Sequence, residues 1–303
     1  MSNNEAKPVL KWAGGKSKLI PEIESRFPKD IDKEITTYIE PFIGGGAVFF
    51  HIMNEYKFKK VIINDINKEL VLMYKVLKEK PYELIEILER KQNEYNNLNS
   101  LEEKSELFYS IREKFNKGKG SISYDIIDIK EIEHASYMIF LNKSCFNGLY
   151  RENKKGLFNV PFGKKEKINI FEKANILSAS NALQDVIILN GDFEGIERYI
   201  NDKSFIYMDP PYRPLKKDSF TDYSREEFND NSQKRLAELC ERIDKVGAKF
   251  IQSNSDPKNT DENDEFFDEL YKQFKIDRIK AARNINSKGT GRGKVSELLI
   301  KNY

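Results

Sequence analysis

The sequence has few of the features that mark exported or membrane-embedded proteins. Only two cysteines occur in 303 residues, Cys145 and Cys240, and they lie far apart. A disulfide framework needs more cysteines at closer spacing, so we expect reduced thiols and a cytoplasmic location. The first residues, MSNNEAKPVLKWAGGK, lack the apolar stretch of a signal peptide, and no run of about 18 apolar residues occurs. The sequence therefore predicts neither secretion nor insertion into a membrane.

The sequence also lacks a net charge that would indicate a partner. Its 51 basic and 49 acidic residues give a formal charge of +2. The charge is nevertheless distributed unevenly. Residues 142–173 hold eight Lys or Arg and three acidic residues, a net +5, and residues 278–301 hold seven and one, a net +6. Two basic tracts fit a polyanion bound on one face, although solvated loops would give the same composition.

Strand-like and helix-like segments alternate in the first 80 residues and again after residue 185. The predicted strands are 37–42, 60–65, 186–192, 204–209, 248–254 and 296–303, and the predicted helices are 16–27, 46–56, 67–79 and 225–246. This alternation predicts an α/β fold with a mainly parallel sheet. The intervening stretch is charged and helical. We therefore expect one domain from residues 1–80 and 186–303, with an inserted, mainly helical domain from residues 81–185.

Two glycine-rich loops resemble nucleotide-binding loops but depart from both common patterns. In EPFIGGG (40–46), a dinucleotide fingerprint would need a further glycine at Phe49. In KWAGGKSKL (11–19), a phosphate-binding loop would need glycine at Leu10. Asp65, at the end of the strand KVIIND, is placed to accept the hydroxyl groups of a ribose. The loops predict a nucleoside without a pyrophosphate. An ATP-dependent enzyme, or a structural turn with a helix cap at Asp65, remains an alternative.

The stretch FIYMDPPYRPL (205–215) ends a buried strand with a carboxylate, two prolines and a tyrosine. Pro210 keeps Asp209 extended, and the prolines have no N–H with which to continue the sheet. The Asp209 carboxylate and the Pro210 carbonyl are therefore two adjacent acceptors, which match the two hydrogens of an NH2 group. Tyr212 can stack on the flat ring that carries this amine. The alternative is an edge turn with a surface tyrosine.

Two fixed acceptors would make an aromatic amine reactive. Its lone pair is delocalised into the ring, and acceptors that draw the hydrogens out of plane restore the nucleophile and stabilise positive charge on nitrogen. The matching electrophile is an activated methyl group on a sulfonium, and neither a metal nor a protein nucleophile is needed. The elbow predicts methylation of an exocyclic amine, as in adenine or cytosine.

The ordered motifs KWAGGK, EPFIGGG, NDIN, FNGLYR…FNVPFG, GDF and DPPY closely resemble the α group of DNA adenine-N6 methyltransferases, the Dam-like enzymes. The resemblance covers nearly the whole chain. It implies a Rossmann-like S-adenosylmethionine-dependent methyltransferase sheet with an inserted target-recognition domain. Members typically methylate adenine in GATC, either alone or beside a cognate restriction endonuclease. It also implies duplex DNA as the partner, with the target adenine flipped out of the helix. We expect a monomer.

The resemblance also implies roles for particular residues. Asp65 would hold the ribose of the cofactor, and Asp192 and Phe193 would hold its adenine. Asp209, Pro210 and Tyr212 would be catalytic. The full set of implied cofactor residues is Trp12, Ala13, Gly14, Lys16, Glu40, Pro41, Phe42, Gly44, Gly46, Asp65, Asp192, Phe193 and Asp209. The implied DNA-binding residues are Lys11, Asn147, Leu149, Arg151, Asn159 and Pro161.

The chemistry of two of these DNA-binding residues suits base recognition. A guanidinium such as that of Arg151 grips the O6/N7 edge of guanine, and an apolar side chain such as Leu149 contacts a thymine methyl group. The basic tract around this hairpin and the segment SKGTGRGK (287–294) would lie on phosphates. The segment RPLKKDSFTDYS (213–224) would close over the DNA or fill the gap left by the flipped base.

Three other functions fit the sequence less well than adenine methylation. Cytosine-N4 methylation uses the same amine chemistry, but such enzymes more often have serine at the first position of the DPPY motif. Cytosine-C5 methylation needs an attacking cysteine, often after a proline, and neither Cys145 in KSCF nor Cys240 in a helical stretch fits. A nucleotide-binding DNA-binding module without methyl transfer is the non-enzymatic alternative.

Overall fold

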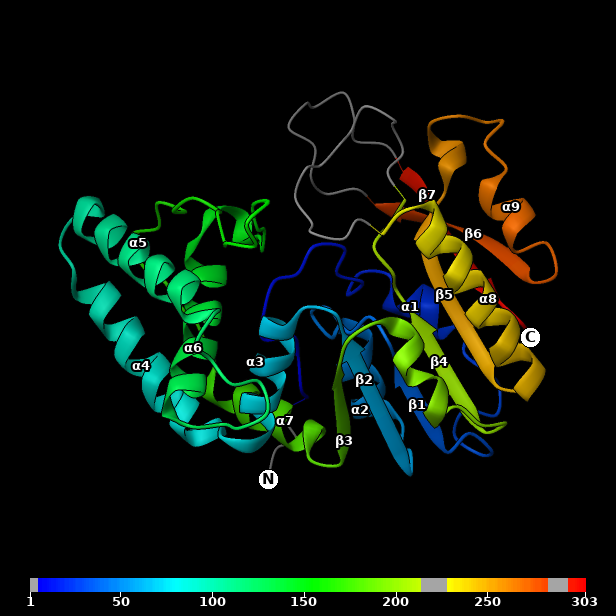
Figure 1. Cartoon of the computed structure of the whole chain (residues 1–303), viewed down its shortest axis with the longest axis horizontal. Coiled ribbons are helices and arrows are strands. Elements are labelled where there is room, and N and C mark those ends of the chain that lie inside the picture. Colours follow the sequence, from blue (N-terminus) through cyan, green and yellow to red (C-terminus); the bar gives the residue numbers. More distant parts are fainter. Residues whose placement is uncertain (1–4, 214–227, 283–293) are drawn as a thin grey trace.

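The computed structural model describes residues 5–213, 228–282 and 294–303. A twisted sheet carries helices on both faces, and a group of helices lies to one side of it (Figure 1). The strands are β1 (Thr37–Glu40), β2 (Lys60–Asp65), β3 (Val186–Asn190), β4 (Ser204–Met208), β5 (Lys249–Ser255), β6 (Lys275–Ala282) and β7 (Lys294–Lys301). The helices are α1 (Ile20–Glu24), α2 (Ala47–Glu55), α3 (Lys68–Glu79), α4 (Pro81–Asn97), α5 (Leu101–Gly118), α6 (Ile129–Ser144), α7 (Lys173–Leu183), α8 (Asp230–Val246) and α9 (Phe266–Leu270), with short 3-10 helices η1 (Phe146–Gly148), η2 (Phe193–Tyr199) and η3 (Pro257–Asn259).

The strands form one seven-stranded sheet in the order β3-β2-β1-β4-β5-β7-β6. The run from β3 to β5 is parallel, and β7 pairs antiparallel with both β5 and β6. The predicted α/β fold with a mainly parallel sheet is confirmed. The order of the strands reverses beside β1, because β2 and β3 extend the sheet on one side of it and β4 and β5 on the other. Ligands bind at such a switch point, outside the carboxyl ends of the strands.

Apolar residues that alternate along the central strands fill two separate cores. Tyr38 and Ile63 face the core that contains α2 and α3, whereas Ile39 and Ile62 face the core that contains α8. All four side chains are fully buried. Burial on both faces explains why these strands are almost continuously hydrophobic and why a parallel arrangement could be predicted from them.

Several predicted boundaries are wrong, and prolines account for three of the differences. β1 stops at Glu40 because Pro41 lacks the N–H needed for pairing, and β4 stops at Met208, two residues before Pro210. The predicted helix 16–27 is reduced to α1, because a helix that began at residue 16 would place Pro21 in its interior. The helix predicted from residue 225 begins at Asp230.

One strand was missed altogether. β6 forms the edge of the sheet and pairs only with β7 among the described strands. Four of the eight residues in its sequence, KIDRIKAA, are charged, because an edge strand leaves one side and one face to solvent. Such a segment does not have the continuous apolar run by which the buried strands were recognised.

The helical region consists of α4, α5 and α6 beside α3, followed by a loop-rich hairpin (Figure 1). Helix α6 packs against α3, α4 and α5, and α7 packs against α3. A capping box fixes the start of α5, in which the Ser100 and Glu103 side chains bond each other's backbone N–H groups. Helices α6 and α7 therefore pack directly on α3, the helix that follows β2.

Candidate active site

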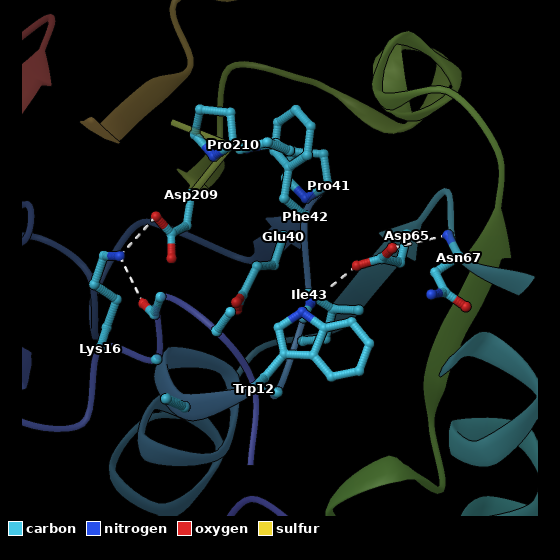
Figure 2. A pocket seen from close by; sticks show the side chains of 18 of the residues that line it. Trp12, Lys16, Glu40, Pro41, Phe42, Ile43, Asp65, Asn67, Asp209 and Pro210 are labelled. Carbon is cyan, nitrogen blue, oxygen red and sulfur yellow. Dashed lines mark hydrogen bonds and ion pairs between the residues drawn. The ribbon is translucent and has the colours of Figure 1, made fainter. Parts of the chain in front are cut away.

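Four neighbouring strand ends place acidic side chains along one edge of the sheet. Asp192 follows β3, Asp65 ends β2, Glu40 ends β1 and Asp209 follows β4, which is the order of these strands in the sheet. All four residues line one cavity of about 1110 Å³. Figure 2 shows Glu40 lying between Asp209 and Asp65. We call this row of residues the strand-tip edge.

The same cavity contains every residue that was predicted to bind the cofactor or to act in catalysis. The lining includes Trp12, Ala13, Gly14, Lys16, Glu40, Pro41, Phe42, Gly44, Gly46, Asp65, Asp192, Phe193, Asp209, Pro210 and Tyr212. Among the predicted DNA-binding residues, Lys11 also lines it. Segments separated by up to two hundred residues therefore line the same cavity, because the parallel strands all end at this edge.

The elbow after β4 is held by residues from three other segments. Ser253 on β5 donates a hydrogen bond of 2.7 Å from its hydroxyl to Oδ1 of Asp209, and Lys16 makes an ion pair of 2.9 Å with the same oxygen. The hydroxyl of Tyr212 donates to Glu297 on β7 at 2.9 Å. Asp209 is half-buried, so its carboxylate is fixed in direction but still reaches the cavity.

Glu40 is a buried carboxyl group at the centre of the strand-tip edge. Its side chain accepts a hydrogen bond of 2.7 Å from the hydroxyl of Tyr38. Burial raises the pKa of Glu40 well above its usual range; the bond from Tyr38 opposes this shift, and the charges of Asp209 and Asp65 add to it. Burial therefore favours the protonated form of Glu40, and a cation bound beside it would favour the ionised form.

Asp65 joins the glycine loop after β1 to the loop after β2. Its two carboxylate oxygens accept backbone N–H groups, one from Gly44 at 3.0 Å and one from Asn67 at 2.9 Å (Figure 2). Burial raises the pKa of Asp65, although these hydrogen bonds oppose the shift. The cap of α3 is Asn67, whose side chain accepts from the N–H groups of Glu69 and Leu70. The cap role considered for Asp65 therefore belongs to Asn67.

The glycine loop lies so close to Trp12 that side chains could not be added. A Cβ atom on Gly45 would lie 2.9 Å from Cβ of Trp12, and a Cβ on Gly46, where φ is +74°, would lie 2.7 Å from the Tyr74 hydroxyl. Glycine is thus required both by backbone conformation and by close approach. The loop seats the indole ring of Trp12 at the cavity wall.

The first loop does not have the structure of a phosphate-binding loop. Residues 5–10 form no strand, and the helix that follows, α1, begins four residues after Lys16. The Lys16 ammonium donates to the Gly14 carbonyl at 2.8 Å and pairs with Asp209, so it is directed at the elbow (Figure 2). The alternative of an ATP-dependent enzyme was based on this loop and loses its support.

An aromatic cluster forms the wall of the cavity near β3. The rings of Phe42 and Phe193 lie 5.4 Å apart, and Phe228 packs against both. Asp192 caps η2 by accepting the N–H of Glu194 and makes an ion pair of 2.8 Å with Arg235. Phe228 and Arg235 were not predicted, because no local pattern in their segments marks them. Ser253, Glu297 and Tyr150 were missed for the same reason.

The hairpin of residues 145–162 places the other predicted DNA-binding residues outside the cavity. Bridges between Cys145 and Phe162 and between Glu152 and Phe158 join its two arms. Arg151 donates from Nε to the Asn159 side chain at 2.8 Å, so these two predicted residues lie together. Further predicted residues of the hairpin are the exposed Asn147 and Pro161 and the half-buried Leu149.

The hairpin also contacts the first loop. The Asn142 side chain, which is fully buried, accepts from the N–H of Lys11 at 2.9 Å, and it donates to the carbonyls of Lys11 and Gly148. The rings of Trp12 and Tyr150 stack with centroids 5.1 Å apart. One loop therefore contacts both the strand-tip edge and the hairpin.

Two segments named in the sequence analysis lie largely outside the described residues. Of RPLKKDSFTDYS, the structure describes Arg213 alone, and of SKGTGRGK it describes only the last residue. Within the described parts of the chain, no helix is long and apolar enough to cross a membrane.

A mainly parallel sheet with a cavity at its switch point, lined by acidic strand ends and a proline elbow, is the arrangement expected of an amine methyltransferase. The sequence match agrees with this class. Residues 12–285 match the D12 class N6 adenine-specific DNA methyltransferases, and the chain belongs to that family. The match decides between the two candidate amines: the target is adenine N6 and not cytosine N4. It also sets aside the non-enzymatic DNA-binding module.

Curated relatives cover the chain almost completely. It is 46% identical over 302 residues to the type II methyltransferase M.MjaIII of Methanocaldococcus jannaschii, which spans 99% of this chain and 100% of the relative. It is 35% identical to the type II methyltransferase M1.LlaDCHI of Lactococcus lactis, over 98% of this chain and 95% of the relative. It is 31% identical to the DNA adenine methylase of Escherichia coli K12, over 99% and 95%.

The cavity fits the cofactor of this family, S-adenosylmethionine. Its volume of about 1110 Å³ lies slightly above the range of about 300–1,000 Å³ for small-molecule sites, which leaves room for a base as well. The aromatic wall suits a purine, Asp65 suits a ribose and the buried Glu40 suits a cationic group. When bound, this cofactor supplies the activated methyl group. The protein transfers that methyl group to the N6 amine of adenine in DNA.

Proposed function

We propose that Asp209, Pro210 and Tyr212 activate the target adenine, and that the enzyme acts on GATC in duplex DNA. The observation that supports the catalytic part is the geometry of the elbow. Oδ1 of Asp209 is engaged by Lys16 and Ser253, and the carboxylate lines the cavity beside Pro210. The second carboxylate oxygen and the Pro210 carbonyl are then the acceptors for the two amine hydrogens.

Asp209, Pro210 and Tyr212 act directly on the target adenine. The two acceptors draw the N–H bonds out of the ring plane, so the nitrogen lone pair becomes available for attack. Tyr212 stacks on the adenine ring and holds it at the elbow. As positive charge develops on the nitrogen, the Asp209 carboxylate stabilises it, and no proton has to leave before attack.

The cofactor roles of the other cavity residues follow their positions along the strand-tip edge. The methionine half of the cofactor would be enclosed by Trp12, Gly14, Glu40 and the glycine loop. Asp65 would accept the ribose hydroxyls with its remaining lone pairs. Phe193 and Phe42 would pack on the adenine ring, with Asp192 near its amine. These residues come from neighbouring strand ends and line one cavity, which supports this arrangement.

Recognition of GATC is proposed for the hairpin. Arg151 and Asn159 lie together, and Leu149 is two residues before Arg151 in the same hairpin, so the hairpin offers guanidinium, amide and apolar groups for base edges. Lys11 is hydrogen-bonded to Asn142, which also bonds Gly148 at the start of the same hairpin, and it lines the cavity. It is therefore placed to contact DNA near the flipped adenine.

We infer a monomer that binds duplex DNA. Because two relatives are type II methyltransferases, a cognate restriction endonuclease should be looked for beside this protein.

A panel of duplexes tests this specificity. The enzyme is given methyl-labelled S-adenosylmethionine and duplexes that contain GATC, a scrambled site or a premethylated GATC. We expect label on adenine of the first duplex alone. Label on adenine of the scrambled duplex at an equal rate would contradict GATC specificity, and label on cytosine would contradict the assignment of the amine.

A further inference from the structure

Lys16 is a buried lysine whose ammonium group is directed at the catalytic elbow. Its side chain is 5% exposed, and its Nζ atom has three partners. These are Oδ1 of Asp209 at 2.9 Å, the carbonyl of Gly14 at 2.8 Å and the ring of Tyr212, whose centroid is 4.6 Å away. Figure 2 shows the first two contacts. A single ammonium thus joins the first glycine loop to two of the three catalytic residues.

The donors to Asp209 converge on one of its two oxygens. Lys16 and Ser253 both contact Oδ1, at 2.9 and 2.7 Å. Among the described residues, no hydrogen bond or ion pair reaches Oδ2. A carboxylate held at one oxygen by two donors cannot rotate freely, so the other oxygen keeps one orientation. This oxygen is the acceptor that the amine requires.

We propose that Lys16 and Ser253 are positioning residues that hold Oδ1 of Asp209 and thereby present Oδ2 to the adenine amine. This inference rests on the proposed role of Asp209. Lys16 also places its charge against one face of the Tyr212 ring, which leaves the other face for the base. Its charge offsets that of Asp209 in a cavity that already contains the carboxyl groups of Glu40 and Asp65.

The proposal differs from the role that the sequence motif implied for Lys16. A lysine that binds the carboxylate of the cofactor would direct its ammonium at the ligand. In the structure that ammonium is shared between Asp209 and Gly14, and the side chain is enclosed. The two roles predict different losses when the charge is removed: a ligand residue lowers cofactor affinity, whereas a positioning residue lowers the rate of transfer in the bound state.

The chain offers a matched control in Lys104 on α5. Lys104 is also buried, donates to a backbone carbonyl (Leu98, 2.8 Å) and faces a tyrosine ring (Tyr95, 5.8 Å), but it lies outside the cavity lining. Lys16→Met, Ser253→Ala and Lys104→Met are compared with the wild-type enzyme. The measurements are binding of S-adenosylhomocysteine by calorimetry, thermal unfolding, and single-turnover transfer to unmethylated genomic DNA at saturating cofactor.

We expect Lys16→Met to lower the single-turnover rate about 10²-fold, the cost of a misplaced catalytic group, with the dissociation constant changed less than about threefold. Ser253→Ala should lower the rate about tenfold, because it removes one hydrogen bond to a charged group. Lys104→Met should leave the rate and the affinity unchanged. Use of genomic DNA makes these results independent of the recognition sequence.

Two outcomes would overturn the inference. One is a Lys16→Met enzyme that binds cofactor more than about tenfold more weakly yet transfers at the wild-type rate once loaded, which would make Lys16 a cofactor ligand. The other is a wild-type rate in both Lys16→Met and Ser253→Ala. If Lys16→Met does not fold, Ser253→Ala decides alone, since its side chain loses one oxygen only. If Asp209→Ala transfers normally, the proposed role of Asp209 fails instead, which separates the two failures.

Discussion

The strand-tip edge and the hairpin of residues 145–162 lie on either side of Trp12 but are constructed differently. At the strand-tip edge, Glu40 and Lys16 are buried. Asp65 and Asp209 have partners from other segments of the chain, and Glu40 accepts a hydrogen bond from Tyr38 on its own strand. On the hairpin, Asn147, Lys155 and Pro161 are exposed. If the proposed roles hold, rigid strand ends position the groups for methyl transfer, whereas DNA recognition belongs to a loop whose residues can change without disturbing the sheet.

The largest effect is expected at the strand-tip edge, from Asp209→Ala. Loss of the fixed acceptor should lower turnover by about 10²–10³-fold or more, because it stabilises charge that develops only during transfer. Cofactor affinity should stay within about tenfold of the wild-type value. Turnover is measured with labelled cofactor and affinity by calorimetry. The control is Asp277→Ala, since Asp277 pairs with Arg26 at the far edge of the sheet and should be dispensable.

Retained turnover in the Asp209→Ala enzyme would remove the carboxylate from the mechanism and would leave the strand-tip edge with a binding role only.

A second test compares two basic residues of the hairpin. Arg151→Ala should lower discrimination between the cognate site and a site with one changed base pair by about 5–150-fold, which corresponds to about 1–3 kcal/mol for a bidentate contact. Lys155→Ala should weaken binding equally on all sequences and reduce the salt dependence by about one phosphate contact. Competition binding at several salt concentrations measures both. Equal losses on all sequences for Arg151→Ala would contradict its role in base recognition.

The strand-tip edge could largely be predicted from the sequence, whereas its supporting residues could not. Parallel strands must end at one edge, so a glycine loop after β1, Asp65 after β2 and the proline elbow after β4 were predicted to meet. Ser253, Glu297 and Arg235 come from β5, β7 and α8, and their approach to the cavity depends on strand order and helix packing. Nothing in their local sequence distinguishes them from other polar residues.

Among the strands, too, some could be predicted from the sequence and one could not. Buried parallel strands are apolar on both faces and were recognised, whereas β6 is a charged edge strand and was missed. The bond between Lys16 and Asp209 joins residues that are almost two hundred positions apart, so the motif KWAGGK could indicate a ligand loop but not the direction of its last side chain.

A third test measures how the protonation of Glu40 affects cofactor binding. Burial raises the pKa of this carboxyl group, so the free protein holds the proton over a wider pH range than an exposed glutamate would. A cationic ligand beside it favours the ionised form, and binding then releases a proton. Cofactor affinity should therefore rise with pH by up to about tenfold per unit, until the free protein is itself ionised.

Calorimetry in buffers of different ionisation enthalpy measures this proton directly. In Glu40→Gln both the release and the pH dependence should disappear. A wild-type affinity that is flat with pH, or that falls as pH rises, would show that the proton on Glu40 is not displaced on binding.

The smallest expected effect lies at the contact between the two regions. The stacked rings of Trp12 and Tyr150 connect the first loop to the hairpin, so cofactor and DNA binding should each strengthen the other. Tyr150→Ala should reduce this reciprocal coupling by about 2–10-fold, as expected for an aromatic pair, whereas Tyr150→Phe, which keeps the ring, should retain it. DNA affinity measured with and without S-adenosylhomocysteine gives the coupling. Unchanged coupling in Tyr150→Ala would mean that the two regions act independently.

The most direct test of the central claim is a crystal structure of the enzyme with S-adenosylhomocysteine and a duplex that carries its target adenine. We expect a flipped adenine whose N6 atom lies about 3 Å from both Oδ2 of Asp209 and the Pro210 carbonyl, with Oδ1 still bonded to Lys16 and Ser253. A target amine that contacts neither acceptor, or an Asp209 carboxylate turned away from the base, would contradict it.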